Sequence, residues 1–186
     1  RLFSVLNKTA KPVLKGDIIA LDEDDVMAIC TRRLVDYCRF FNRQQVAMRL
    51  LNSLPPSDKS SWTTITMLYD MVTIIFHKIY PKCCDVPQKS MEELKNERPD
   101  VSTLDEYYKF AVEYFDLMAN AFAEVSAVFR GNSPGKAIVQ YRNADGGSVL
   151  YRPLGQRIFT QIISTLCDSC TLEEAFERLR FLPTSL

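Results

Sequence analysis

Two short segments of the chain carry residue types that suit the binding of phosphate oxygens. The first, Asn7 to Pro12 (NKTAKP), places two lysines, an amide and a hydroxyl between an apolar stretch and a proline-set turn. Ammonium, amide and hydroxyl groups are common donors to the nucleic-acid backbone. We therefore take Asn7, Lys8 and Lys11 as candidate phosphate ligands, with an ordinary polar loop as the alternative.

The second segment gathers donors around a glycine-rich turn and the start of the helix that follows it. Its candidate ligands are Arg142, Arg152, Gln156 and Arg157. A helix N-terminus presents unpaired N–H groups and favours anions, so arginines beside it form a candidate anion site. A solvated polar face is the alternative interpretation.

Residue types that support catalysis or nucleotide binding are sparse. The six glycines form neither GxGxxG nor GxxxxGK[ST], which disfavours the two common nucleotide-binding loops. His77 is the single histidine, and any Ser-His-Asp or Cys-His site would have to use it. Because it ends an apolar helix, where a histidine interacts favourably with the helix dipole, we assign no catalytic residue.

The cysteines offer one weak metal or redox motif, Cys167-Asp-Ser-Cys170, which has the C-x-x-C spacing. Together with Cys83, Cys84 and His77 it could complete a zinc site, but Cys83 and Cys84 are adjacent, which is unlike a zinc knuckle. We expect reduced thiols that pack at a junction between helices, and we assign no metal and no cofactor.

Helical periodicity dominates the elements that must position these residues. Apolar residues recur at three- and four-residue steps in five stretches: 26–41 after the acidic run 22–25, 65–79 up to Pro81, 102–129 behind a Ser102 N-cap, 153–166, and 172–179 behind a Thr171/Glu174 capping box. The third stretch is rich in Tyr and Phe, which predicts a central core helix, with a stacking platform for bases as the alternative.

The period changes only near 137–152. There Ala137, Val139 and Tyr141 precede the turn Asp145 to Gly147 in the alternating pattern of a β-hairpin. Alternation of Val46, Met48 and Leu50 also permits a short strand. The predicted fold class is mainly α, a multi-helix bundle with one small β-hairpin.

Composition limits the classes of protein. The chain has 186 residues, 47% hydrophobic, with 23 Lys+Arg against 23 Asp+Glu, so it is too apolar for disorder and lacks the basic excess of a dedicated nucleic-acid binder. Its two ends are mildly basic and its middle is acidic. No apolar run approaches the roughly 18 residues of a membrane helix, so we expect no membrane partner and a cytoplasmic protein.

Four segments resemble the DGQHR-domain proteins, which include DndB-like regulators of DNA sulfur modification and relatives in defence loci. They span nearly the whole chain in order: Phe3 to Pro12 (FSVLNKTAKP), Thr63 to Tyr69 (TTITMLY), Leu150 to Gln156 (LYRPLGQ) and Leu172 to Ala175 (LEEA). The Asp-Gly-Gln-His-Arg motif that names the family does not occur here.

The resemblance implies a ParB-like or sulfiredoxin-like core upstream, followed by a mainly helical C-terminal region. On this interpretation residues 1–21 are the tail of a truncated ParB-like α/β core. Residues 22–186 are a helical domain with a short hairpin near 137–152. The family's phosphate-handling motif would then precede Arg1, so we expect this fragment to be non-catalytic.

Two functions are expected from different classes. The first is the helical region of a DGQHR-type protein in DNA modification, its regulation or defence, which contacts DNA phosphate as part of a longer parent chain. The second is a protein-interaction or oligomerisation module that binds a protein partner or a second copy and makes no nucleic-acid contact.

Overall fold

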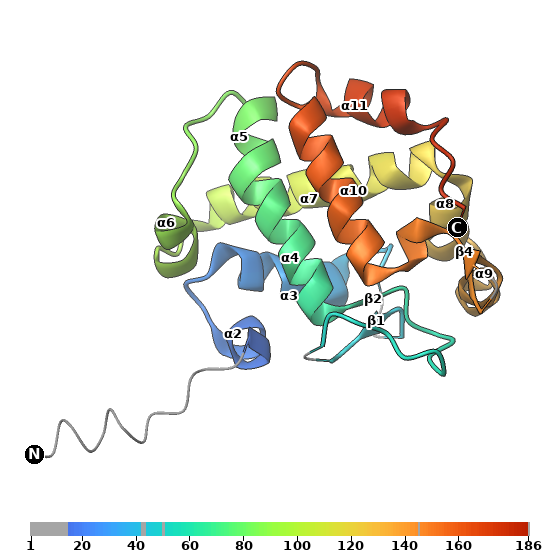
Figure 1. Ribbon diagram of the computed structural model, residues 1–186. Coiled ribbons are helices and arrows are strands. Elements are labelled where there is room, and N and C mark those ends of the chain that lie inside the picture. Colours follow the sequence, from blue (N-terminus) through green and yellow to red (C-terminus); the bar gives the residue numbers. More distant parts are fainter. Residues whose placement is uncertain (1–14, 42–43, 50, 145, 186) are drawn as a thin grey trace, which may run out of the picture.

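The computed structural model describes residues 15–41, 44–49, 51–144 and 146–185, and it is mainly helical (Figure 1). The helices are α2 (Lys15–Leu21), α3 (Val26–Tyr37), α4 (Ile65–Ile74), the π-helical η1 (Ile75–Ile79), α5 (Tyr80–Cys83), α6 (Met91–Asn96), α7 (Val101–Ala121), α8 (Ala123–Phe129), α9 (Pro134–Tyr141), the 3-10 helix η2 (Val149–Tyr151), α10 (Pro153–Leu166) and α11 (Leu172–Leu179). The predicted mainly-α fold class is confirmed.

Two pairs of very short strands accompany the helices. β1 (Val46–Ala47) runs parallel to β2 (Thr63–Thr64), with Val46 opposite Thr63. β3 (Arg142–Asn143) and β4 (Gly146–Gly147) form an antiparallel hairpin, with Arg142 opposite Gly147. The strand permitted near Val46 is therefore present, and its partner lies on the other side of a loop that begins after residue 47.

The helices pack as a bundle around α4 and α7. The column formed by α4, η1 and α5 lies beside α10, and α7 crosses both of them (Figure 1). α4 also contacts α3, while α7 contacts α3, α8 and α11. The predicted central place of the aromatic helix is confirmed, because α7 meets three of the described helices.

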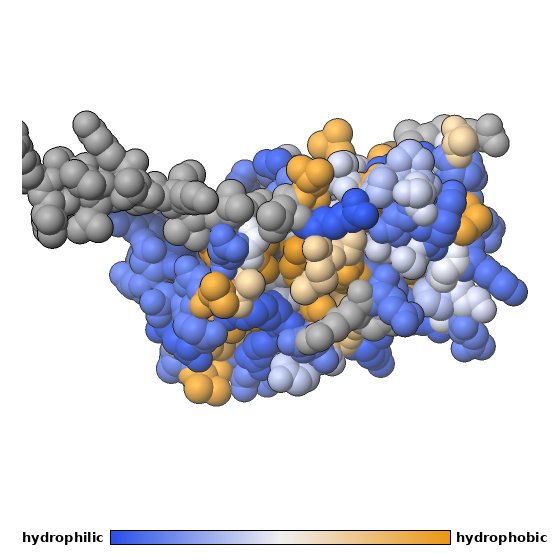
Figure 2. All heavy atoms as spheres, turned by 90° about the horizontal axis from the view of Figure 1, so that it is seen from below, coloured by the Kyte–Doolittle hydropathy of each residue, from blue (hydrophilic) through white to orange (hydrophobic). Residues whose placement is uncertain are grey.

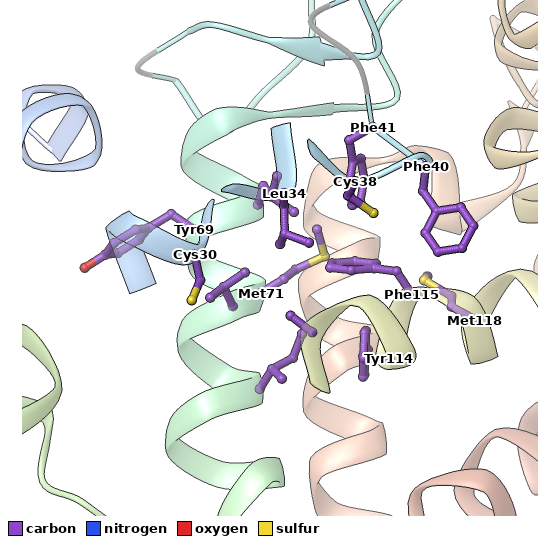
Figure 3. Packing of buried hydrophobic residues seen from close by; sticks show 14 of the residues in the cluster. Cys30, Leu34, Cys38, Phe40, Phe41, Tyr69, Met71, Tyr114, Phe115 and Met118 are labelled. Carbon is purple, nitrogen blue, oxygen red and sulfur yellow. The ribbon is translucent and has the colours of Figure 1, made fainter. Parts of the chain in front are cut away.

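The core fills the space between these helices. Leu34 of α3, Met71 of α4 and Phe115 of α7 are fully buried and point toward one another (Figure 3). Aromatic rings continue the core, with centroids of Phe41 and Phe115 4.9 Å apart and those of Trp62 and Phe129 4.8 Å apart. Such edge-to-face pairs contribute about 0.5–1.5 kcal/mol each beyond the area they bury.

The N-terminal caps explain where several helices begin. Asp25 accepts the Ala28 amide at the start of α3, and the Thr171 hydroxyl accepts the Glu174 amide at the start of α11. The Glu174 carboxylate returns a bond to the Thr171 amide, so the predicted capping box is confirmed.

The predicted helix over 102–129 is wrong at its start and in its middle. Asp100, and not Ser102, caps α7 by accepting the Thr103 amide. At Phe122 the backbone becomes extended (φ −124°, ψ 113°), which separates α7 from α8. This break accompanies an edge-on contact between the buried rings of Phe122 and Phe159, so tertiary packing overrides local periodicity there.

Pro81 does not end the second predicted helix. The backbone continues through the π-helical turn η1 into α5, and Pro81 occupies the first turn of α5. A proline is tolerated in a first helical turn, where its missing N–H would lack an intrahelical partner anyway.

The strand expected at Ala137 to Tyr141 is also wrong. These residues belong to α9, which starts at Pro134 and buries Ala137 and Ile138 on one side while Val139 is exposed. The hairpin predicted near 137–152 is present only at residues 142–147, because a helical stripe and a strand alternation cannot be distinguished over five residues.

Residues 15–21 form the helix α2, which the apolar pattern did not predict. α2 packs on α3 and α4, and Ile19 is buried in the same core as their side chains. Among the described helices, none is long and apolar enough to cross a membrane.

Candidate phosphate-binding site

Arg142 is a buried cation at the point where α9 passes into the hairpin. Its side chain is 8% exposed, and its guanidinium donates to the carbonyls of Ser61 at 2.7 Å and of Asp58 at 2.8 Å. Burial lowers the pKa of Arg142, while the nearby Asp58 carboxylate opposes that shift. An arginine keeps its proton under such conditions, so a full positive charge is held beneath the loop at residues 58–61.

Asp58 organises the loop that Arg142 supports. Its Oδ1 accepts the amides of Ser60 at 2.9 Å and of Ser61 at 2.8 Å, and it lies 3.8 Å from the Arg142 guanidinium. Burial works against ionisation, but these two amides and Arg142 hold the pKa of Asp58 below its usual value. The loop therefore has a fixed shape, and its exposed Lys59 is carried at a defined place.

Arg152 supplies a second guanidinium at the other side of the hairpin. It precedes α10, and its Nη2 donates to the carbonyls of Asn143 and Gly146, each at 3.1 Å. Its Nε is buried and has no hydrogen-bond partner in the described structure. A buried donor without a partner costs about 1–3 kcal/mol.

Lys59, Arg142 and Arg152 line one pocket of about 250 Å³. Pro55 and Pro56 form part of its wall, and no carboxylate belongs to the lining that the structure describes. Guanidinium groups match the geometry of phosphate oxygens, and a nearby lysine adds a point charge. The pocket is therefore suited to an anion such as a phosphate group.

The other predicted ligands lie elsewhere. Gln156 is fully buried, accepts the Thr63 hydroxyl at 2.7 Å, and donates to the carbonyls of Trp62 and Leu150 at 3.0 Å each. Arg157 is exposed on α10 and does not line the described part of the pocket. Asn7, Lys8 and Lys11 lie outside the described residues.

Sequence reasoning missed Lys59 and the wall that Pro55 and Pro56 provide. These residues precede β2 and are more than eighty positions away from Arg142. No local pattern in the sequence indicated that the hairpin would lie against the loop at residues 58–61. The hydrogen bonds from Arg142 to the carbonyls of Asp58 and Ser61 join the two segments.

The structure also locates the residues of the alternative chemistries. Of the six rings that could form a stacking platform, Tyr108 is half-buried with the Arg33 guanidinium over its face, and the other five pack in the core: Tyr107, Tyr114, Phe115, Phe122 and Phe129. His77 lies in η1 with its Nε2 3.3 Å from Nε2 of Gln88. Among the described residues, no group of three or more His, Cys, Asp or Glu side chains could hold a metal ion.

Comparison of the chain with protein-family models, with curated proteins and with solved structures found no match.

Proposed function

We propose that this chain is a DNA-phosphate-contacting helical region of a DGQHR-type protein, with a ParB-like core before it in the parent chain. The pocket lined by Lys59, Arg142 and Arg152 carries the proposal, because it gathers three cationic residues in one concave site whose described lining holds no carboxylate. Phosphate contacts of this kind position a protein on nucleic acid without reading its sequence. The region acts by binding, in support of DNA modification, its regulation or defence.

The local charge explains how a neutral chain could bind a polyanion. Asp58 is the carboxylate that pairs with Arg142, and it also accepts the amides of its own loop. The positive charges of Lys59 and Arg152 are therefore less compensated than the overall balance of 23 against 23 suggests. Binding through such a patch should weaken as salt rises, because phosphate neutralisation releases counterions.

The test is fluorescence anisotropy with a short double-stranded DNA of mixed sequence over a series of salt concentrations. Lys59→Glu changes an exposed side chain, and we expect it to weaken binding about tenfold and to flatten the salt slope by about 0.9. Lys95→Glu is the matched control, because Lys95 is exposed on α6, at the far side of the molecule from α9 (Figure 1). Equal losses in both variants, or an undetectable interaction of the unaltered chain at low salt, would contradict the proposal.

The N-terminal ligands are tested separately. Replacing Lys8 and Lys11 together by Ala should reduce the salt slope by about two if both contact phosphate. An unchanged affinity and slope would remove Asn7 to Pro12 from the binding surface and leave the pocket as the phosphate contact.

A specific surface favours the second function, a protein-interaction or oligomerisation module. A mainly apolar groove of about 360 Å³ lies between α2 and α3, with Ile19, Val35 and Met48 in its lining. Met48 is 65% exposed. Leu21, which follows the groove-lining residues of α2 in the sequence, is 75% exposed. Figure 2 shows this lower face, where apolar side chains gather near the middle and hydrophilic ones border them.

Sedimentation velocity distinguishes this alternative. If the groove joins two copies, the chain sediments as a dimer and Met48→Glu converts it to a monomer while leaving DNA binding unchanged. A monomer at every concentration excludes self-association through this surface.

A further inference from the structure

The fold brings four cysteines together at one end of the bundle. Cys83 and Cys84 end the α4–η1–α5 column, and Cys167 ends the neighbouring α10, with Cys170 just beyond it. Lys82, next to Cys83, donates to the Ser164 carbonyl at 2.8 Å and pairs with Asp168, so the end of α5 lies against the end of α10, where the thiols of Cys83 and Cys167 interact. All six cysteines of the chain lie among the described residues, and each is a free thiol.

The two thiols of this pair differ in access. Cys83 is partly buried and lines a cavity of about 340 Å³, together with Cys84 and Cys170. Cys167 is only 7% exposed and does not belong to the described lining of that cavity. A small solute therefore reaches Cys83 before it reaches Cys167.

The two thiols also differ in acidity. The hydrogen bond from Cys167 lowers the pKa of Cys83, burial opposes this, and the neighbouring Lys82 adds to the lowering. The same hydrogen bond, with burial, raises the pKa of Cys167. Glu173 and Glu113 face Cys83 and act against its ionisation, while Lys82 is itself paired with Asp168 at 2.5 Å.

We propose that Cys83 and Cys167 are a peroxide-reactive pair, in which Cys83 is the attacking thiol and Cys167 the resolving thiol. The Cys83 thiolate attacks one oxygen of hydrogen peroxide, the O–O bond breaks, and the leaving hydroxide takes a proton to become water. Cys83 is then a sulfenic acid. The Cys167 sulfur attacks the Cys83 sulfur, the S–O bond breaks, and the sulfenic hydroxyl leaves as water after taking the Cys167 proton. The two cysteines are oxidised to one disulfide, and the peroxide is reduced to two waters.

The other two cysteines of the cluster are less suited to resolve Cys83. Burial and the adjacent Cys83 raise the pKa of Cys84. The Cys170 Sγ contacts the Leu166 carbonyl at 3.2 Å, as a donor to the last turn of α10. Neither shares the direct thiol contact that joins Cys83 to Cys167.

The test uses the reduced full chain, treated with hydrogen peroxide in the presence of a chelator. The intact mass should fall by about 2 Da, because a disulfide forms with the loss of two hydrogen atoms. Trypsin leaves Cys83 on one peptide with Cys84, and Cys167 on one peptide with Cys170, so variants assign the pair. Cys83→Ser and Cys167→Ser should each abolish the cross-link, and the matched double variant Cys84→Ser with Cys170→Ser should retain it.

Three results would overturn the pair. They are a cross-link that survives Cys83→Ser, a cross-link lost in the Cys84→Ser and Cys170→Ser variant, and accumulation of Cys83 sulfinic acid, about 32 Da heavier, in the unaltered chain. If a variant does not fold, alkylation of the unaltered chain by iodoacetamide gives an independent measurement. Fragment-ion spectra should then show Cys83 modified about fivefold faster than Cys84, and equal rates would contradict the assignment of Cys83 as the attacking thiol.

Discussion

Tyr69 of α4 donates its hydroxyl to the carboxylate of Asp25, the N-cap of α3, with 2.6 Å between Oη and Oδ2. Both side chains are buried, and the other oxygen of Asp25 accepts the Ala28 amide. One carboxylate therefore starts a helix and ties it to its neighbour. Because a buried acceptor is costly without its donors, the stability of the α3–α4 contact depends on this pair.

Tyr69→Phe should destabilise the protein by about 1–3 kcal/mol, because it leaves Oδ2 of Asp25 buried without this donor. Tyr37→Phe is the matched control, since Tyr37 is 78% exposed, and it should change the free energy of unfolding by less than about 0.5 kcal/mol. Urea unfolding followed by circular dichroism measures both. Equal effects of the two substitutions would show that the pair contributes little.

The pH dependence of stability should also report on Asp25. Burial raises its pKa above the ordinary 3.8, although the bonds from Tyr69 and Ala28 oppose the shift. The protonated Asp25 side chain therefore contributes stability that is fully present below pH 3.8 and is lost as the pH rises through the higher pKa of the folded state. Asp25→Asn can still cap α3 but has no charge.

We thus expect Asp25→Asn to gain stability relative to the unaltered protein as the pH rises from about 4 to neutral. Paired urea titrations across that range measure the difference in the free energy of unfolding between the two proteins. Asp58 and Asp116, whose pKa values are lowered, contribute equally to the pH dependence of both proteins, so their contributions cancel in the difference. A difference that stays constant with pH would contradict the raised pKa.

Gln156 should prove to be a stabilising residue. Gln156→Leu keeps the volume but leaves the Thr63 hydroxyl and the carbonyls of Trp62 and Leu150 without their partner, at a cost of about 2–5 kcal/mol. Arg157→Ala, on the exposed side of α10, should cost less than about 0.5 kcal/mol. Thermal unfolding of both variants checks this, and a neutral Gln156→Leu would show that the buried amide is dispensable.

Gly147 should be the least replaceable glycine of the hairpin. Its φ is +106°, and an added Cβ would lie 2.1 Å from the Tyr141 carbonyl oxygen, which is backbone and cannot rotate away. We expect Gly147→Ala to cost about 1–3 kcal/mol and to weaken the proposed DNA binding, because the hairpin carries Arg142 and Asn143. Gly135→Ala is the control, since its nearest neighbour is 3.9 Å away, and it should be neutral or stabilising by about 0.5–1 kcal/mol. Chemical denaturation of the two variants compares them directly.

The two arginines of the candidate site could be predicted from the sequence, but its lysine could not. Arg142 and Arg152 were predicted together because they flank one glycine-rich turn, and the structure places both on one pocket. Lys59 joins them through a contact between distant segments, which no local pattern encodes. Gln156 carries an amide that could bind phosphate, but the side chain is buried and its amide oxygen accepts the Thr63 hydroxyl instead.

The sequence by itself determined the mainly helical fold, the apolar faces of the long helices and the Thr171/Glu174 cap, because periodicity and capping are properties of neighbouring residues. The tertiary structure alone decided the break at Phe122, the passage of the helix through Pro81 and the helical state of residues 137–141. It also decided which polar side chains face a pocket and which thiols meet. These features depend on packing between segments far apart in the chain, and that packing outweighs local preferences of a few tenths of a kcal/mol per residue.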